Sequence, residues 1–273
     1  MTTPLPTAGA AGATPLLELR DLTVSFGSVA ALSRVSLQLD GGQVCCVLGE
    51  NGSGKSTLVA LLSGLLRHGE GELLVAGRPV RFRSPGQARA QGIATVWPDL
   101  AIAPLMSVWR NFFLGAEPTR GVWPLRRLDV ATAQQVTVRA MARVGVAGLD
   151  PDQAASGLQA GERQSLAIAR ALHFGARVLV IDEPTTPMTL SQRGLVLQSV
   201  VTARDEGLAV VFVTHSPQYA HLVGDRFLLL ARGRVAGNLT RDDVDADDLT
   251  RLVAGGDELS RLTATLRRAA PGR

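Results

Sequence analysis

The chain has 273 residues, 46% of them apolar and 4% aromatic, which suffices for one large domain or two small ones with a core of Leu, Val and Ala. The formal net charge of +4 and the pI of about 10.0 suit any polyanion or an anionic membrane face, and do not by themselves indicate nucleic acid. No apolar run approaches the ~20 residues of a membrane helix, and residues 1–15, which lack a basic start and an apolar stretch, exclude a signal peptide and predict a disordered tail.

Short apolar strands alternate with helical patterns along most of the chain. Residues 16–26 alternate like a half-buried strand, whereas the unbroken apolar run 44–49 is typical of a strand covered on both faces. Residues 55–66 carry leucines at helical spacing. Further strands are predicted at 35–40, 72–77, 93–97, 176–183 and 208–215, with a hairpin at 226–237. The alternation predicts an α/β fold with a mainly parallel central sheet.

Residues 106–174 interrupt this alternation, because they contain no convincing strand and look helical at 131–146 and 160–174. We expect a helical subdomain here, inserted into a domain that spans residues 16–240. The Asp-rich residues 241–273 predict a C-terminal helical extension.

The two cysteines, Cys45 and Cys46, are adjacent in a predicted strand. Neighbouring side chains on a strand point to opposite faces, so these two are poor disulfide partners. We interpret them as core thiols of a protein from a reducing compartment.

Gly49, Gly54, Lys55 and Ser56 fit the P-loop pattern and lie between a buried strand and a helix. The glycines let backbone amides turn toward phosphate oxygens, and the helix adds its positive N-terminal end. Lys55 is the only lysine beside 27 arginines. A compact ammonium reaches the β- and γ-phosphates as a point charge, which a planar guanidinium does not do in the same way. The strand–loop–helix context disfavours the alternative, a Gly-rich turn with a chance lysine.

Two carboxylates and a histidine follow two predicted buried strands. Asp182 and Glu183 end one of them, where ligands of parallel sheets bind, although two acids can also mark an ordinary strand end. Asp182 is placed to hold Mg²⁺ together with the Ser56 hydroxyl, and Glu183 to polarise an attacking water. His215 ends the other strand and could orient that water. The histidines without such a setting are interpreted as surface or packing residues: His68, His173 and His221.

The order of these motifs resembles the ATP-binding cassette (ABC) ATPases over roughly residues 16–240. The resemblance rests on Phe26, the P-loop, a degraded signature at 158–164, the run Asp182–Glu183–Pro184–Thr185, and His215. The chain is most similar to importers of simple sugars of the ribose, xylose and fructose kind, in segments such as "GRPVRFRSPGQARAQGIATV" and "LTRLVAGGDEL". Members of that subfamily often carry two cassettes in one chain, whereas this chain carries one.

The resemblance implies a P-loop ATPase cassette with a mainly parallel core sheet, an N-terminal antiparallel β subdomain and an inserted helical subdomain. It implies ATP and Mg²⁺ as cofactors, with Phe26 stacked on adenine, although a core Phe that closes a strand is the alternative. The residues that would wrap the phosphates are Gly49, Glu50, Asn51, Gly52, Ser53, Gly54, Lys55, Ser56 and Thr57. The signature residues that would face the γ-phosphate held by a partner cassette are Leu158, Gln159, Ala160, Gly161 and Glu162.

The resemblance also implies partners. Two cassettes, identical or different, would sandwich two ATP molecules head to tail at the cytoplasmic face of the membrane. A membrane permease would couple their closure to transport, and an extracytoplasmic sugar-binding protein would deliver the substrate. No nucleic acid is expected.

The sequence departs from the family at two site positions. The glutamine expected after the strand at 93–97 is replaced by Pro98, which has no side-chain oxygen and no N–H, and Trp97 before it is interpreted as a core plug or a docking surface. The signature serine is replaced by Gln159. In addition, Pro187 and Met188 are unusual after Glu183. We expect nucleotide binding to survive and hydrolysis to be weakened.

Three functions are therefore weighed. The first is the ATP-hydrolysing subunit of a sugar importer, and the second is a hydrolysis-impaired cassette that regulates or braces a permease or partner cassette. A soluble ABC protein acting on nucleic acid is disfavoured, because the chain has neither a second cassette nor a long coiled coil. Kinases and GTPases would leave the signature and His215 unexplained.

Overall fold

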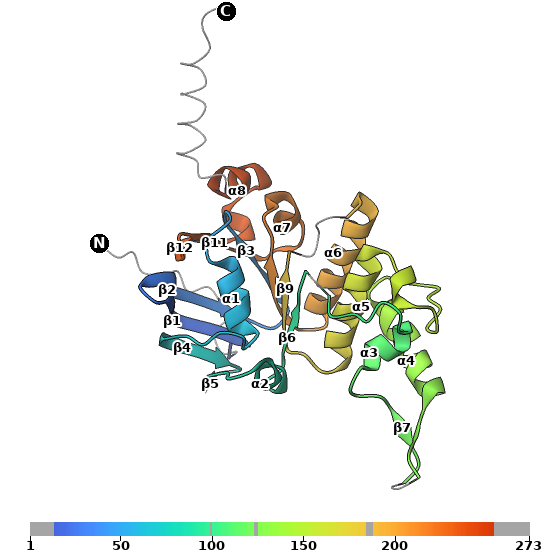
Figure 1. Cartoon of the computed structure of the whole chain (residues 1–273). Coiled ribbons are helices and arrows are strands. Elements are labelled where there is room, and N and C mark those ends of the chain that lie inside the picture. Colours follow the sequence, from blue (N-terminus) through green and yellow to red (C-terminus); the bar gives the residue numbers. More distant parts are fainter. Residues whose placement is uncertain (1–13, 99, 123–124, 184–187, 254–273) are drawn as a thin grey trace, which may run out of the picture.

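The computed structural model describes residues 14–98, 100–122, 125–183 and 188–253. The predicted tail at 1–15 therefore lies almost entirely outside the described residues, as do Pro187 and most of the extension at 241–273. Within the described part, the chain forms two sheets and a group of helices to one side of them (Figure 1).

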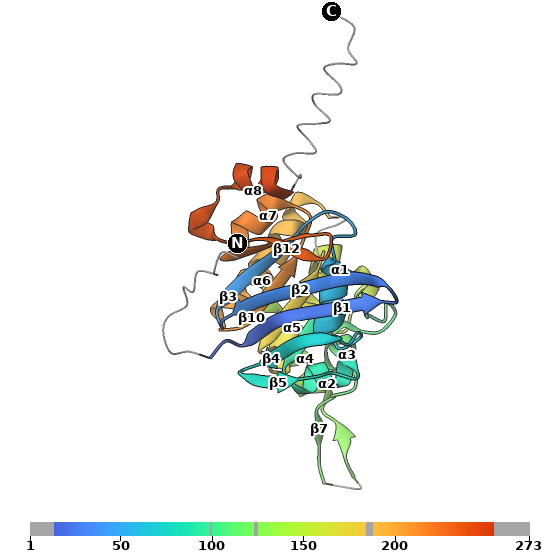
Figure 2. The same ribbon diagram turned by 90° about the vertical axis from the view of Figure 1, so that its left-hand side faces the viewer.

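The N-terminal sheet is antiparallel and has the order β2-β1-β4-β5, as expected for the β subdomain. Its strands are β1 (Leu17–Phe26), β2 (Val29–Leu39), β4 (Glu70–Val75) and β5 (Arg78–Val80). Leu22 and Val24 of β1 and Val35, Leu37 and Leu39 of β2 are buried at alternate positions, which is the pattern of a sheet with one solvated face. Figure 2 views this sheet from its own side.

The central sheet has the order β12-β11-β3-β10-β9-β6 and confirms the predicted parallel core. Its parallel strands are β3 (Gln43–Leu48), β6 (Ile93–Val96), β9 (Val178–Asp182), β10 (Ala209–Val213) and β11 (Arg226–Ala231). β12 (Arg234–Thr240) closes the edge as the antiparallel arm of the predicted hairpin. Every residue of β9 and β10 is buried, which explains their unbroken apolar runs.

Helices cover both faces of the central sheet and split the core into two hydrophobic clusters. Cys45 belongs to the cluster shared with the N-terminal sheet and helix α1 (Lys55–Leu62), and Cys46 belongs to the cluster on the opposite face. Both thiols are free and fully buried, as their strand positions predict. The remaining helices around the sheets are α2 (Pro85–Ala90), α6 (Leu190–Asp205), α7 (Pro217–Val223) and α8 (Ala246–Val253), and a 3-10 turn covers Arg241–Asp243.

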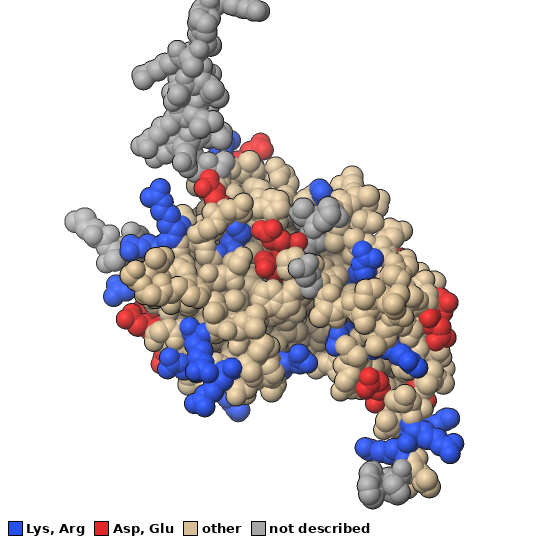
Figure 3. All heavy atoms as spheres, in the orientation of Figure 1, with Lys and Arg blue, Asp and Glu red and all other residues tan. Residues whose placement is uncertain are grey.

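Residues 106–174 are mainly helical, with α3 (Val108–Phe113), α4 (Val130–Arg143), a 3-10 turn (Ala155–Gly157) and α5 (Ala160–His173). The expectation that this stretch holds no strand is wrong, because β7 (Thr119–Arg120) and β8 (Arg127–Leu128) pair as a short hairpin. Both strands are exposed on every residue, so they carry no apolar alternation that a sequence pattern could reveal. In Figure 3 the blue arginine side chains of this hairpin stand clear of the body.

The three histidines without a proposed role are surface or packing residues, as expected: His173 is exposed, His221 half-buried and His68 buried. His173 lies within 5.4 Å, between ring centroids, of Phe112, Phe113 and Phe174. His221 stacks on Phe227, and His68 is buried. Across the described residues, no helix combines the length and the apolar composition needed to cross a membrane.

The placement of the cysteines leads to a test of the fold. Burial raises the pKa of Cys45 to about 12 and raises that of Cys46 well above its ordinary value. Because the thiolate is the reactive form, we expect neither residue to react with a disulfide reagent at pH 8 in the native protein, and both to react in denaturant. Titration with the reagent before and after unfolding measures this, and rapid reaction of one thiol in the native state would contradict the placement of the two side chains in separate parts of the core.

Candidate functional site

The loop between β3 and α1 leaves no room for side chains at two of its glycines. A Cβ atom on Gly49 would lie 2.2 Å from the carbonyl oxygen of Leu230, and one on Gly54 would lie 2.9 Å from that of Ala31. Both residues also have positive φ angles, 151° and 108°. The loop therefore needs glycine at both positions, and its backbone amides are left uncovered at the start of α1.

Lys55, the first residue of α1, is 6% exposed. Its Nζ donates to the carbonyl oxygens of Gly49 at 2.7 Å and of Glu50 at 2.9 Å. The ammonium is thus held over the loop by the loop's own backbone. The hydroxyl of Ser53 is buried beside it and has no hydrogen-bond partner among the described residues.

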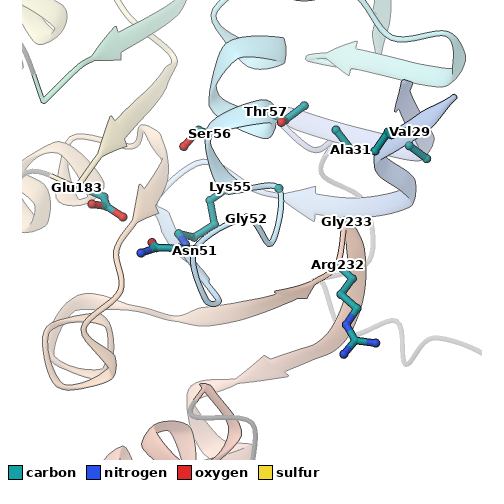
Figure 4. Close-up of a pocket in the computed structure, with 12 residues that line it drawn as sticks. Val29, Ala31, Asn51, Gly52, Lys55, Ser56, Thr57, Glu183, Arg232 and Gly233 are labelled. Carbon is teal, nitrogen blue, oxygen red and sulfur yellow. The ribbon is translucent and has the colours of Figure 1, made fainter. Parts of the chain in front are cut away.

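A cavity of about 480 Å³ opens at this loop (Figure 4). Asn51, Gly52 and Gly54 of the loop line it, with Lys55, Ser56 and Thr57 from the first turn of α1, Val29, Ala30 and Ala31 from β2, Arg232 and Gly233 from the β11–β12 turn, and Glu183 beyond β9. Figure 4 shows Glu183 directing its carboxylate into the cavity from the side of the sheet, across from Ser56. The cavity therefore joins uncovered amides, one ammonium, two hydroxyls and one carboxylate.

The β11–β12 turn holds the loop in place. The amide of Gly233 donates to the carbonyl oxygen of Ser53 at 2.9 Å, and the amide of Ser33 donates to that of Gly233 at 2.7 Å. The hairpin was predicted, but the role of its turn at the cavity was not, nor that of Val29, Ala30, Ala31 and Arg232, because none of them belongs to a motif. The only available signal was the Arg-Gly pair inside the predicted hairpin.

The sheet order brings the two predicted carboxylates to the loop. β10 lies between β3 and β9, with Val213 paired to Val47 on one side and to Asp182 on the other. Asp182 is only 7% exposed. Its pKa is raised, chiefly by burial and then by the charge of Glu183, while the charge of Lys55 opposes the shift. The three groups therefore share one electrostatic environment.

Glu183 has a φ of 41°, which is uncommon for a side chain with a Cβ atom. Its amide donates to the carbonyl oxygen of Val213 at 2.9 Å, which holds the strained backbone in place. The Nδ1 atom of His215 lies 3.7 Å from Oε2 of Glu183. The structure thus brings together Lys55, Asp182, Glu183 and His215 from three separate stretches of sequence.

The predicted signature lies elsewhere. Gln159 is the N-cap of α5, and its backbone N–H donates to Oε2 of Glu162 at 2.7 Å. Leu158 is buried, and Gly161 packs against α6. None of the residues 158–162 lines the cavity described above. At this end of α5 Gln159 is exposed, whereas Ala160 and Glu162 are half-buried and Gly161 is buried.

Three further residues that the sequence singled out do not line the cavity. Phe26 is 52% exposed and ends β1 opposite Val29, which does line the cavity. Trp97 is partly buried against the cluster that contains Cys45, which favours the core-plug interpretation over a docking surface. Pro98 follows β6 and is exposed.

Comparison with known proteins shows the family of the chain. A model of the ABC transporter family matches residues 32–186. The chain is 40% identical over 246 residues to "Ribose import ATP-binding protein RbsA 1" of Streptomyces coelicolor, covering 90% of this chain and 48% of that protein. It is 32% identical over 238 residues to "Xylose/arabinose import ATP-binding protein XylG" of Sulfolobus acidocaldarius, covering 87% of this chain and 93% of that protein. The chain thus spans about half the length of the curated ribose-import relatives that it matches.

The fold is shared with solved ABC cassettes. The structure of an ATP-binding cassette of an ABC transporter in its ADP conformation superposes with a TM-score of 0.73 at 20% identity, covering 88% of this chain and 95% of that one. With the phosphate loop, the paired carboxylates and a family match over more than half of its length, the chain belongs to the ABC transporter family, as a single ATP-binding cassette.

Proposed function

We propose that this chain is the ATP-binding and ATP-hydrolysing subunit of an importer for a simple sugar. The observation that carries the proposal is the cavity that the loop, Lys55 and Glu183 line together (Figure 4). A triphosphate fits this donor set, because the loop ends at the N-terminus of α1 and Lys55 lines the cavity. The loop keeps this path only with glycine at positions 49 and 54, where a Cβ atom would collide with the surrounding backbone. Residues 49–57 bind the phosphates, and Lys55 exchanges the loop carbonyls for phosphate oxygens.

Mg²⁺ fits the same site. The Ser56 hydroxyl lines the cavity, and the Asp182 carboxylate lies at the end of β9, next to Glu183, which also lines it. Both are hard oxygen donors, and they would hold Mg²⁺. When bound, the ion neutralises phosphate charge. Asp182 needs its carboxylate ionised for this role, and the nearby ammonium of Lys55 favours that form.

Glu183 is proposed as the catalytic carboxylate. It accepts a proton from the attacking water, and His215, 3.7 Å away, orients that water and the carboxylate. Its backbone strain is of the kind that concentrates at catalytic positions. Phe26, at the exposed end of β1, is proposed to stack on the adenine at the outer end of the cavity.

A second cassette completes the unit. Residues 158–162 lie outside the chain's own cavity, yet the first turn of α5 offers the uncovered amides and positive dipole end that suit an anion. Head-to-tail pairing with an identical or different cassette would place this turn at the partner's γ-phosphate. The closed pair is favoured by nucleotide because each nucleotide then contacts two subunits instead of one.

The substrate and the partners are proposed from the relatives. Proteins named for ribose import and for xylose or arabinose import cover most of this chain. We propose that the chain works at the cytoplasmic face of the membrane, where it docks to a permease. An extracytoplasmic sugar-binding protein delivers the sugar to that permease. The chain does not act on nucleic acid. Hydrolysis is slowed by Pro98, which offers no side-chain oxygen to the metal or the water.

Removal of the Lys55 ammonium tests the binding site. We expect Lys55→Ala to weaken Mg-ATP binding by about 10- to 10²-fold, because a charge-assisted hydrogen bond contributes ~1.5–3 kcal/mol and at least one is lost. Lys55→Arg should also bind poorly if a point charge is required. Calorimetry with Mg-ATP measures both, with Arg78→Ala on the exposed β5 strand as the control. Unchanged affinity in Lys55→Ala would remove the basis of the proposal.

Removal of the Asp182 charge should stabilise the protein and abolish the metal site. The folded-state pKa of Asp182 is raised, so the ionised form is destabilising above its ordinary pKa, and protonation relieves this as the pH falls through the raised value. At pH 7.5 we expect Asp182→Asn to raise the melting temperature of the ligand-free protein, because the buried charge is removed. The difference should shrink toward acidic pH, and Mg-ATP should no longer stabilise the variant.

Differential scanning fluorimetry across pH, with and without Mg-ATP, measures both effects. A variant that melts lower than the wild type at pH 7.5, or that keeps the full Mg-ATP shift, would show that Asp182 does not have this role.

Restoration of an amide after β6 tests the slowed hydrolysis. Pro98→Gln should raise the turnover rate by about 10²-fold, the usual effect of one well-placed polar group on a transition state. Pro98→Ala separates the oxygen from the relief of backbone stiffness, and we expect it to change the rate by less than about threefold. Single-turnover hydrolysis measures both variants, and equal gains in the two would assign the effect to the backbone.

A further inference from the structure

The first turns of α5 and α6 are packed closely against each other. A Cβ atom on Gly161 would lie 2.8 Å from the carbonyl oxygen of Gln192 and 3.1 Å from its Cα. Figure 1 shows the two helices side by side. The backbone of Gln192 is therefore fixed against the first turn of α5, with its side chain next to that of Gln159.

A chain of hydrogen bonds fixes which way both amide side chains point. The backbone N–H of Thr189 donates to Oε1 of Gln192 at 3.2 Å, and Nε2 of Gln192 donates to Oε1 of Gln159 at 3.1 Å. A backbone N–H can only donate, so the atom of Gln192 that it meets must be the oxygen. The other end of Gln192 is then a donor, and the atom of Gln159 that it meets must be an oxygen too.

This arrangement leaves the NH₂ group of Gln159 at the free end of the series of hydrogen bonds. The backbone cap of α5 is made by Glu162 and leaves the NH₂ group unused. No acceptor for this group lies among the residues that the structure describes, and Gln159 is exposed. Two N–H donors thus point outward at the first turn of a 14-residue helix.

We propose that Gln192 is a positioning residue that sets the orientation of the Gln159 amide, so that its NH₂ group and not its oxygen faces the γ-phosphate held by the partner cassette. The inference rests on the proposed head-to-tail pairing. A reversed amide would present lone pairs to an anion, which is repulsive, whereas the observed orientation presents hydrogen-bond donors. On this basis the replacement of the signature serine does not remove the donor, because Gln159 and Gln192 supply one together.

The obvious alternative is that Gln192 only caps α6 through Thr189. Gln192→Glu separates the two roles. A carboxylate still accepts from the Thr189 amide and suits a helix N-terminus, but it cannot donate to Gln159. It would accept from the NH₂ group of Gln159 and turn the oxygen of that residue outward.

The test compares this substitution in two backgrounds. In the chain with Gln159, we expect Gln192→Glu to lower the rate of hydrolysis by about tenfold or more. Self-association is measured in protein that also carries Glu183→Gln, which lacks the proposed catalytic carboxylate. There we expect Gln192→Glu to weaken the Mg-ATP-dependent association by the same factor. In a Gln159→Ser background, where a hydroxyl rotates freely and needs no partner, the same substitution should change both by less than about twofold. Gln198→Glu, at an exposed position of the same helix, adds the same charge away from the first turn of α5 and should change neither.

Steady-state assays measure hydrolysis, sedimentation velocity measures self-association, and the melting temperature measures stability. The melting temperature of Gln192→Glu should equal or exceed that of the parent chain. Equal losses in the parent and Gln159→Ser backgrounds would assign the effect to charge and overturn the inference, as would no loss in the parent background.

Failure of the proposed function would look different from failure of this inference: neither the parent chain nor any variant would hydrolyse ATP or self-associate in its presence. In that event a double-mutant cycle of Gln159→Ala and Gln192→Ala on unfolding free energy still decides whether the amide pair exists. A coupling of zero would then reject the inference on its own.

Discussion

The packing of backbone against backbone around the β3–α1 loop is the constraint on which the site depends. Gly49 lies against the carbonyl of Leu230 and Gly54 against that of Ala31, and no side chain can enter either contact. The same closeness keeps the amides of the loop uncovered and brings the Lys55 ammonium within hydrogen-bond distance of two loop carbonyls. Because cation, amides and helix end are fixed before any ligand arrives, little conformational entropy remains to be lost on binding.

The carboxylates lie at the cavity because of the sheet, and their burial is costly. β10 separates β9 from β3 by a single strand, so Asp182 lies near Lys55 at the carboxyl edge. Burial raises the Asp182 pKa and the backbone of Glu183 is strained, so both groups destabilise the fold that carries them. Such local costs are typical of sites that are organised for chemistry and compensated by the core around them.

Sequence patterns predicted the parts of the structure where one physical signal dominates. The strands β3, β9 and β10 are buried on both faces and appear as unbroken apolar runs, and the loop glycines are demanded by backbone geometry. The patterns failed where tertiary contacts decide. The β7–β8 hairpin has only exposed residues, and the helices α2, α3, α6 and α7 were not predicted. Arg232 and Gly233 reach the cavity only through the register of the last hairpin, which no local motif encodes.

The position of β3 in the sheet has a consequence for synthesis on the ribosome. β3 comes early in the chain, yet both of its neighbours in the sheet, β10 and β11, belong to the last third, and the amide of Gly233 bonds to the loop that follows β3. A nascent chain can form the antiparallel N-terminal sheet first, but β3 stays without a partner strand until β10 and β11 emerge. The ability to hold a nucleotide should therefore arise late in translation and all at once.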